Sequence, residues 1–344
     1  MKNKIILHGS HYKDNFGDTL LLKAIQDSFP SFEVLSTTGS YKVLSSIAID
    51  KSGLIDALFS KYFVYGGGGY FGEPDKSVLR WSVRFIYRHA LIGVLRRILG
   101  CKYIFIGTGF GPLSNFFAKK IARFIINGSE LTCLRDKESV SFAKEISPRA
   151  NIKQTADIVP WYIESNFKKQ TNNKLILHLH VPVGDYKSVT GIVEAYINFR
   201  NMCYPKHQLV VISDSENDIQ QTWFFSFLRD QYPELEIVEY ENVDHLLSLI
   251  SSADYVVTNK LHVGIVAVSL RIKVASIYMH SKTRRFYEQI NRVEFCKSKD
   301  NLGSFNILDF FIYVNGTEYD FSAIDNLVYD SYKNYIYLKE WLAK

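Results

Sequence analysis

The sequence predicts an α/β protein of two doubly wound, Rossmann-like domains with a cleft between them. Short apolar runs rich in β-branched and aromatic residues alternate with longer runs of helical period along the 344 residues, as is typical of parallel sheets covered by helices. Glycines gather where two of the early strands end. A polar stretch at 166–173 separates two alternating halves, each long enough to bury its own core.

In the first half, four-residue runs such as 62–65 are apolar throughout, which predicts strands buried on both faces. The segments between these runs repeat apolar residues every three or four positions, which predicts helices. The expected strands are 5–7, 62–65 and 102–106. The expected helices are 18–29, 77–99 and 116–126.

The second half repeats this alternation and ends in an amphipathic helix. The expected strands are 174–180, 208–213, 235–239, 254–258 and 273–278, and the expected helices are 192–201, 217–232, 243–251, 261–270, 283–290 and 324–341. We therefore expect an N-terminal domain at 1–166, a C-terminal domain at 174–304 and an extension at 305–344 that packs back on the N-terminal domain.

Composition narrows the class of protein. With 47% hydrophobic and 22% charged residues, the chain is neither disordered nor collagen-like. Its net charge of +6 suits an anionic ligand, but no nucleic-acid-binding motif is present, so we expect no nucleic acid partner. The four cysteines lie far apart without zinc-ligand spacing. No apolar run is long enough for a signal peptide or a membrane span, which predicts a cytoplasmic protein.

Two glycine-rich stretches follow expected strands. One comes after 62–65 and contains Gly67, Gly68 and Gly69; the other comes after 102–106 and contains Gly109. The first matches GxGxxG, but the acid that a dinucleotide site needs about 20 residues later is missing. The sequence therefore disfavours a nicotinamide or flavin cofactor. We expect these glycines to let the backbone approach another ligand closely.

The loop after the first strand is rich in polar side chains that could serve chemistry. It holds His11, Asp14, Asn15 and Asp18 ahead of a helix. A carboxylate here could act as a general base. The alternative for Asp18 is a helix N-cap.

Cations follow other strands. A buried strand ends at Thr258 and a helix begins soon after, so Lys260, Leu261 and His262 stand at a helix N-terminus, which favours anions. Lys282 follows the next strand. For His262 alone, a structural role is the alternative.

Arg135 follows a short buried strand that begins at Leu131. Its guanidinium could hold a carboxylate or phosphate through two parallel hydrogen bonds. An intramolecular pair with Asp136 or Glu138 is the alternative.

Taken in order, these residues resemble the motif series of the polysaccharide pyruvyl transferase family. The matching positions are Asn15-x-Gly17-Asp18, Gly66–Gly69, Gly107-x-Gly109-x-Gly111-Pro112, Arg135-Asp136-x-x-Ser139, Ala156-Asp157, Lys260-Leu261-His262, and Tyr278-x-x-x-Lys282 with Phe286. Two departures stand out. The family usually has Arg where this chain has Lys260, and Gly and Pro where it has Arg271 and Lys273.

The resemblance implies a glycosyltransferase B-like fold with the acceptor on the N-terminal domain and the donor on the C-terminal domain. It implies an enzyme that moves the enolpyruvyl group of phosphoenolpyruvate onto two hydroxyls of a sugar and releases phosphate. The sugar would belong to a capsule, an exopolysaccharide or a lipid-linked precursor. Arg135, His262 and Lys282 fall on the family's essential Arg, His and Lys. No metal or cofactor is required.

The residues suit this chemistry by themselves, because a carboxylate and a phosphate need several cations and a helix N-terminus. Arg135, Lys260, Leu261 and Lys282 are the expected donor-binding residues. His262 is the expected general acid or phosphate partner, and Asp14 or Asp18 is the expected base. His178 and His180 lack a further ligand at metal spacing. We expect these two residues, together with His11 and Asn15, to contact the acceptor.

Two other functions are open at this point. One is a nucleotide-sugar-dependent glycosyltransferase of similar fold; the other is a non-catalytic glycan- or anion-binding protein. Two expected helices are basic and also carry apolar residues, and such faces suit anionic lipid at the inner membrane surface, although a solvated helix face is the commoner explanation. Their residues are Arg80, Arg84, Arg88, Arg96 and Arg97, then Lys119, Lys120 and Arg123 beside Phe116, Phe117 and Phe124.

Overall fold

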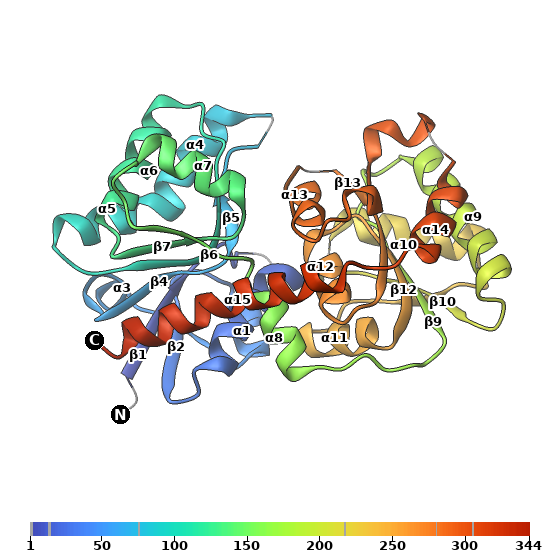
Figure 1. Cartoon of the computed structure of the whole chain (residues 1–344), viewed down its shortest axis with the longest axis horizontal. Helices are drawn as coiled ribbons and strands as arrows, with labels where there is room; N and C mark the ends of the chain where they lie inside the picture. Colours follow the sequence, from blue (N-terminus) through green and yellow to red (C-terminus); the bar gives the residue numbers. More distant parts are fainter. Residues whose placement is uncertain (1–2, 13–14, 75, 217, 280, 305) are drawn as a thin grey trace. The chain divides into compact units, whose positions relative to one another are not determined.

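The computed structural model describes residues 3–12, 15–74, 76–216, 218–279, 281–304 and 306–344. They form two compact units, each built on a parallel β-sheet with alternating helices (Figure 1). Unit 1 takes in the described residues of 1–14, 18–162 and 328–344, and unit 2 takes in 15–17 and 163–327. This architecture confirms the predicted fold class of two doubly wound, Rossmann-like domains.

The sheet of unit 1 has the strand order β3-β2-β1-β4-β6-β7-β8, with β5 paired to β6, and its strand pairs are parallel. The strands are β1 Asn3–His8, β2 Phe32–Ser36, β3 Asp50–Lys51, β4 Tyr62–Tyr65, β5 Gly68–Phe71, β6 Ile104–Phe110, β7 Leu131–Leu134 and β8 Ile152–Gln154. The order reverses between β1 and β4, which is where doubly wound sheets bind ligands.

Helices connect these strands. They are α1 Phe16–Ser28, α2 Tyr41–Ser46, α3 Leu54–Phe59, α4 Val78–Phe85, the π-helical turn η1 Ile86–Ala90, α5 Leu91–Ile98, α6 Phe116–Gly128, α7 Lys137–Ile146 and α8 Val159–Asn166. The core between sheet and helices is aromatic: the rings of Tyr65 and Phe105 stack 4.4 Å apart, and Phe71 meets Phe105 edge-on.

Unit 2 has the order β11-β10-β9-β12-β13-β14, again with parallel pairs. Its strands are β9 Lys174–His178, β10 Gln208–Ile212, β11 Glu236–Val238, β12 Ala253–Thr258, β13 Lys273–Tyr278 and β14 Cys296–Ser298. Its helices are α9 Tyr186–Cys203, α10 Ile219–Gln231, α11 Val243–Ser251, α12 Leu261–Ser269, α13 Ser281–Gln289, the 3-10 turns η2 Val293–Phe295 and η3 Lys299–Ser304, and α14 Ile307–Gly316. The reversal here lies between β9 and β12.

The final helix, α15 Phe321–Leu342, begins among residues of unit 2 and ends among those of unit 1. Within unit 1, the Asn334 amide donates to the carbonyl oxygen of Ala156 at 2.8 Å, and the Tyr335 hydroxyl donates to that of Ile158 at 2.9 Å. These bonds fix the end of the chain against the segment after β8. The grouping of residues 15–17 with unit 2 has no counterpart in the sequence-based boundaries.

Three local expectations need correction. Gly109 does not lie in a loop, because β6 continues through it to Phe110, and Gly68 and Gly69 open the short strand β5. Arg96 does not lie on a basic surface. It is fully buried, and its guanidinium donates to the carbonyl oxygens of Ala57 and Ser60, among others, at 2.8 and 2.9 Å, which offsets the cost of burying the charge.

Candidate functional site

The candidate site lies at the carboxyl edge of the unit 2 sheet. Four neighbouring strands, β10, β9, β12 and β13, end there side by side. Each is followed or ended by a polar residue that could serve chemistry: Asp214, His178, Lys260 and Lys282, respectively. In doubly wound sheets this edge is the place where ligands bind.

Asp214 is the centre of a buried network at this edge. Its carboxylate pairs with the Lys260 ammonium at 3.2 Å and lies 3.4 Å from Nε2 of His178. The Gln221 amide donates to the same carboxylate at 2.7 Å. Burial raises the pKa of Asp214, but His178 and Lys260 outweigh burial and leave that pKa well below its ordinary value. Asp214 is therefore an ionised carboxylate that positions Lys260.

Thr258 connects this network to the start of α12. Its hydroxyl accepts from the backbone N–H of Lys260 at 3.0 Å and bonds Nδ1 of His178 at 3.1 Å. Lys260 occupies the N-cap position, and its side chain makes no capping bond. The first turn of α12 begins at buried Leu261, and its backbone N–H groups lie at the carboxyl edge beside the Lys260 ammonium. This arrangement favours the binding of anions.

Residues 15–17 pack on this edge of unit 2. The backbone N–H of Phe16 donates to the carbonyl oxygen of Asp214 at 2.8 Å, and Asn15 forms an antiparallel bridge with Ser215. Gly17 lies so close to His262 that a Cβ at position 17 would stand 2.1 Å from Nδ1 of the ring. Glycine is required at position 17 because the imidazole occupies the space that a side chain would take.

Asn15 also begins helix α1. Its side-chain oxygen accepts from the backbone N–H of Gly17 at 3.0 Å, which is a capping bond. Asp18 lies in the first turn of α1 and is partly buried. Asn15 therefore takes the capping position, which corrects the alternative that gave it to Asp18. The other candidate base, Asp14, lies outside the described residues.

His178 and His180 differ in environment. His178 is fully buried and bonds within the network around Asp214, so its position does not suit the acceptor contact expected from sequence. His180 is partly exposed and lies 3.3 Å from Asp218. Burial and then the nearby Lys260 lower the pKa of His180. Lys282 is exposed in the first turn of α13, beside α12.

Arg135 lies in unit 1, just after β7. Its guanidinium pairs with Asp157 at 3.3 Å and lies 3.7 Å from Asp136. Gly109 and Gly69 leave room for it: a Cβ would stand 2.9 Å from Nη2 at the first position and 3.5 Å at the second. The intramolecular pair with Asp136 is thus present, and Asp157 is the closer partner.

The other predicted residues of unit 1 are packed. His11 is buried, and its Nδ1 bonds the Ser36 hydroxyl at 3.2 Å, so the acceptor contact expected for it does not fit its position. A side chain at Gly67 would meet Leu21 at 2.7 Å, and Gly68 has a φ of +113°, which favours glycine. These glycines serve the packing and path of the backbone between β4 and β5.

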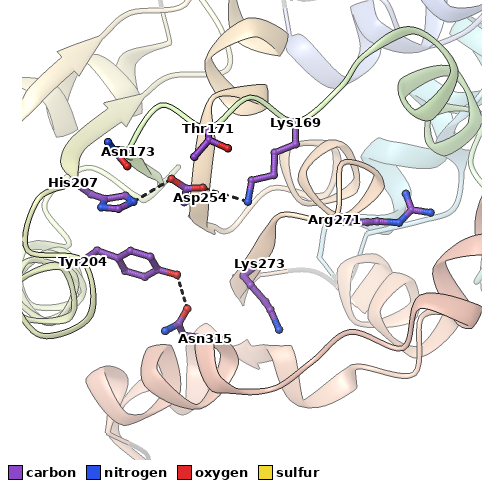
Figure 2. A pocket seen from close by; sticks show the side chains of 9 residues that line it. All are labelled: Lys169, Thr171, Asn173, Tyr204, His207, Asp254, Arg271, Lys273 and Asn315. Atoms are coloured by element: carbon purple, nitrogen blue, oxygen red, sulfur yellow. Dashed lines mark hydrogen bonds and ion pairs between the residues drawn. The ribbon is translucent and has the colours of Figure 1, made fainter.

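A pocket of about 460 Å³ lies elsewhere on unit 2 (Figure 2). Asn173, Asp254 and Lys273 line it at or next to the first residues of their strands. It is therefore at the amino edge of the sheet, opposite the candidate site. On one wall Asp254 joins His207 at 3.0 Å and Lys169 at 3.2 Å.

Sequence reasoning missed Asp214 and Gln221 and did not foresee the partnership of Arg135 with Asp157. Asp214 follows an expected strand, and that was the available signal. Among the residues that the structure describes, no group of three or more His, Cys, Asp or Glu side chains could hold a metal ion. The helices in the described ranges include none with the length and apolar character to cross a membrane.

A family model for polysaccharide pyruvyl transferases matches residues 15–281. The chain belongs to this family. The matched region begins at Asn15 and takes in Arg135, Asp214, Lys260 and His262. As a polysaccharide pyruvyl transferase family member, the chain is a transferase. A sequence search of curated proteins finds no match.

Solved structures resemble this pyruvyl transferase family member in fold. UDP-GlcNAc 2-epimerase from Methanocaldococcus jannaschii, in complex with UDP-GlcNAc and UDP, superposes with a TM-score of 0.58 at 11% identity, over 98% of this chain and 99% of that chain. The Neisseria meningitidis enzyme bound to UDP-GlcNAc also gives 0.58 at 11%, over 100% of both chains. Anabaena Alr3699/HepE, in complex with UDP and glucose, gives 0.54 at 11%, over 99% and 98%. These likenesses show a glycosyltransferase B-like fold.

Proposed function

We propose that this transferase moves the enolpyruvyl group of phosphoenolpyruvate onto two hydroxyls of one sugar in a surface polysaccharide or its lipid-linked precursor. The observation that carries the proposal is the juxtaposition of Lys260 and His262 at the N-terminus of α12 with Lys282 at the start of neighbouring α13. The donor is a small molecule with a carboxylate and a phosphate. Two cations and a helix N-terminus match its charge.

The reaction balances without an oxidant, a reductant or water. A proton adds to the methylene carbon of phosphoenolpyruvate and makes the next carbon electrophilic. One sugar hydroxyl adds to that carbon and loses its proton. Phosphate then leaves as the second hydroxyl adds and loses its own proton. The product is a pyruvate ketal, and the released group is inorganic phosphate.

His262 is the proposed general acid or phosphate partner. Its ring is held against Gly17, which limits its freedom before substrate binds. Lys260 is held by Asp214, so its ammonium is oriented as well as charged. We assign His178 and Gln221 to positioning roles, because they are buried, bond each other, and contact Asp214 and Thr258 in the network.

Asp18 is the proposed base for an acceptor hydroxyl, on the residues that the structure describes. It follows the segment that packs on unit 2 and lies in the first turn of α1. Arg135 corresponds to the family's essential arginine. Its pairing with Asp157 orients the guanidinium beside Gly69 and Gly109, where we propose that it binds an anionic group of a substrate.

A nucleotide-sugar-dependent glycosyltransferase is the second candidate. The observation in its favour is the fold shared with three proteins solved with UDP or a UDP-sugar. A diphosphate would use the same helix N-terminus and cations. A non-catalytic anion- or glycan-binding protein would need the same cations but not the imidazole of His262.

Calorimetric titration separates these functions. The purified chain is titrated with phosphoenolpyruvate and, in parallel, with a panel of UDP-sugars. Lys282→Ala tests the site, and Lys206→Ala is the matched control, because Lys206 is an exposed lysine near the amino edge of the same sheet. We expect saturable binding of phosphoenolpyruvate that weakens at least tenfold in Lys282→Ala and is unchanged in Lys206→Ala.

Binding of a UDP-sugar without phosphoenolpyruvate would overturn the donor assignment and favour the glycosyltransferase. Phosphate release then tests catalysis, with phosphoenolpyruvate and a set of glycan acceptors. We expect His262→Ala to lower release by two orders of magnitude or more while the donor still binds. Retention of all activity in His262→Ala would contradict the catalytic role.

A further inference from the structure

Charge is segregated along this chain. From Lys76 to Ser129, a stretch of 54 residues, there are ten Lys and Arg and no Asp or Glu. The other 290 residues hold 31 Lys and Arg against 35 Asp and Glu, a net charge of −4. The whole positive excess of the protein therefore belongs to one segment of unit 1, which contains α4, η1, α5, β6 and α6.

The first helices of this segment expose apolar side chains together with arginines. α4, η1 and α5 follow one another without a break, and three apolar–arginine pairs recur every fourth residue on their exposed side. The pairs are Leu79-Arg80, Val83-Arg84 and Tyr87-Arg88. Leu79 is 72% exposed and Tyr87 is 78% exposed. The buried side of the same helices is formed by residues such as Phe85 and Ala90.

Helix α6 packs beside α4, η1 and α5 (Figure 1). It carries the same combination of exposed apolar and basic side chains. Phe116 and Phe117 are exposed at its first turn, and the Lys120 ammonium lies 4.3 Å from the centre of the Phe116 ring. Farther along, Arg97 of α5 lies over the ring of Phe124 at 4.0 Å. We call the exposed side of these helices the α4–α6 face. Its large apolar members are Leu79, Val83, Tyr87, Leu91, Ile98, Leu99, Phe116, Phe117 and Phe124.

Within the part of the chain that the structure describes, several cations of this face have no carboxylate partner. Lys119 does pair with Glu145 at 2.9 Å, and Lys102, which precedes β6, pairs with Glu130 at 2.7 Å. Among the described residues, no ion pair is formed by Arg80, Arg84, Lys120 or Arg123. The α4–α6 face thus combines exposed apolar side chains with uncompensated positive charge, and a soluble helix face ordinarily has only one of these features.

We propose that the α4–α6 face docks on the surface of a lipid bilayer that contains anionic headgroups. Apolar side chains would enter the headgroup–acyl boundary, and the interleaved arginines and lysines would remain at the level of the phosphates. Exposed Tyr and Phe suit this boundary because their rings favour the membrane interface. The charge of the face is complementary to anionic lipid, and its apolar residues are not explained by contact with a nucleic acid backbone.

Flotation of the full chain with lipid vesicles tests the proposal. One vesicle set is phosphatidylcholine, and the other contains about one third phosphatidylglycerol, both at 0.1 M NaCl. We expect flotation with the anionic vesicles alone, reduced at 0.5 M NaCl because salt screens the charges. Arg80→Glu/Arg84→Glu should weaken binding about tenfold or more. Lys206→Glu/Arg229→Glu is the control, since it reverses two exposed cations of unit 2.

The apolar contribution has its own pair of variants. Val83→Ser/Phe117→Ser should weaken vesicle binding even at low salt, whereas Met202→Ser/Ile219→Ser, at exposed apolar positions of unit 2, should not. Equal binding of all variants, or no binding to anionic vesicles, would overturn the proposal. Light scattering is run in parallel: a dimer that Val83→Ser/Phe117→Ser dissociates would show that a second copy covers the face, and would also overturn it.

Discussion

Gly17 and His262 are in direct contact although 245 positions separate them: a Cβ at residue 17 would lie 2.1 Å from Nδ1 and 2.7 Å from Cγ of the imidazole. The contact lies within unit 2, because residues 15–17 group with that unit. It is accompanied by the bond from the Phe16 N–H to the Asp214 carbonyl oxygen. The first residues of α1 therefore set the position of the histidine that we propose as the acid.

Gly17→Ala should displace His262 and lower the transfer rate. The new methyl group cannot coexist with the ring, and a shift of about 1 Å in a catalytic group can cost about a hundredfold in rate. We expect phosphate release to fall at least tenfold while the thermal midpoint changes by only a few degrees. The control is Gly191→Ala in α9, where the nearest atom would stand 3.8 Å from the new Cβ. Wild-type release by Gly17→Ala would contradict the positioning role.

Gly109→Ala and Gly69→Ala form a matched pair around Arg135. A Cβ at 109 would stand 2.9 Å from Nε and Nη2, whereas one at 69 would meet Nη2 at an ordinary 3.5 Å. Overpacking of this kind costs about 1–3 kcal/mol. We expect Gly109→Ala to lose that amount in urea unfolding, and Gly69→Ala to stay within about 0.5 kcal/mol of the native chain. Equal losses in both would show that the guanidinium is not the cause.

Asp214→Asn should be strongly destabilising. The change removes the negative charge that faces the Lys260 ammonium and His178, and it puts an NH2 donor where one carboxylate oxygen stood. Breaking a buried ion pair on one side costs about 3–5 kcal/mol, and because Lys260 is partly exposed we expect a loss of about 3 kcal/mol. Glu239→Gln is the control, because its pair with Arg229 is exposed and is worth about 1 kcal/mol or less. A loss below that of the control would contradict the network.

Three buried histidines of unit 1 should make folding sensitive to acid. His8 and His89 lie 3.1 Å apart, and burial lowers the pKa of His11 to about 4 and that of His89 to about 3. The unfolded chain takes up protons below its histidine pKa of about 6.5, whereas the folded chain does not. The full free energy of unfolding is therefore present above that pH and falls as the pH is lowered, until the folded pKa is reached.

Urea unfolding between pH 7.5 and 4.5 measures this loss. Each of these histidines contributes a slope of up to about 1.4 kcal/mol per pH unit. His11→Gln keeps a hydrogen-bonding side chain beside Ser36 and removes one titrating group. Below pH 6.5, the unfolding free energy of this variant should fall less steeply with decreasing pH than that of the native chain, by up to the contribution of one proton, about 1.4 kcal/mol per pH unit. An unchanged slope would mean that His11 is protonated in the folded chain.

Local pattern was sufficient for several of the larger or wholly apolar elements of the fold. The prediction for 62–65 coincides with β4, that for 273–278 with β13 and that for 243–251 with α11, because a buried strand or an amphipathic helix is visible in its own residues. The short strands β2, β3 and β8 were not predicted. Unlike the uniformly apolar β4, each of these strands contains charged or polar residues that interrupt the apolar run.

The sequence by itself determined that the chain is α/β, that strand ends at 258 and 278 lead into helices bearing Lys260, His262 and Lys282, and that the motif order matches one family. The tertiary structure alone decided that Asp214 holds Lys260, that Gly17 meets His262, and that Arg96 is buried. The physical reason is the distance along the sequence over which each interaction acts. Periodicity and capping act over a few residues, whereas an ion pair or a close packing contact depends on which strand ends the sheet brings together.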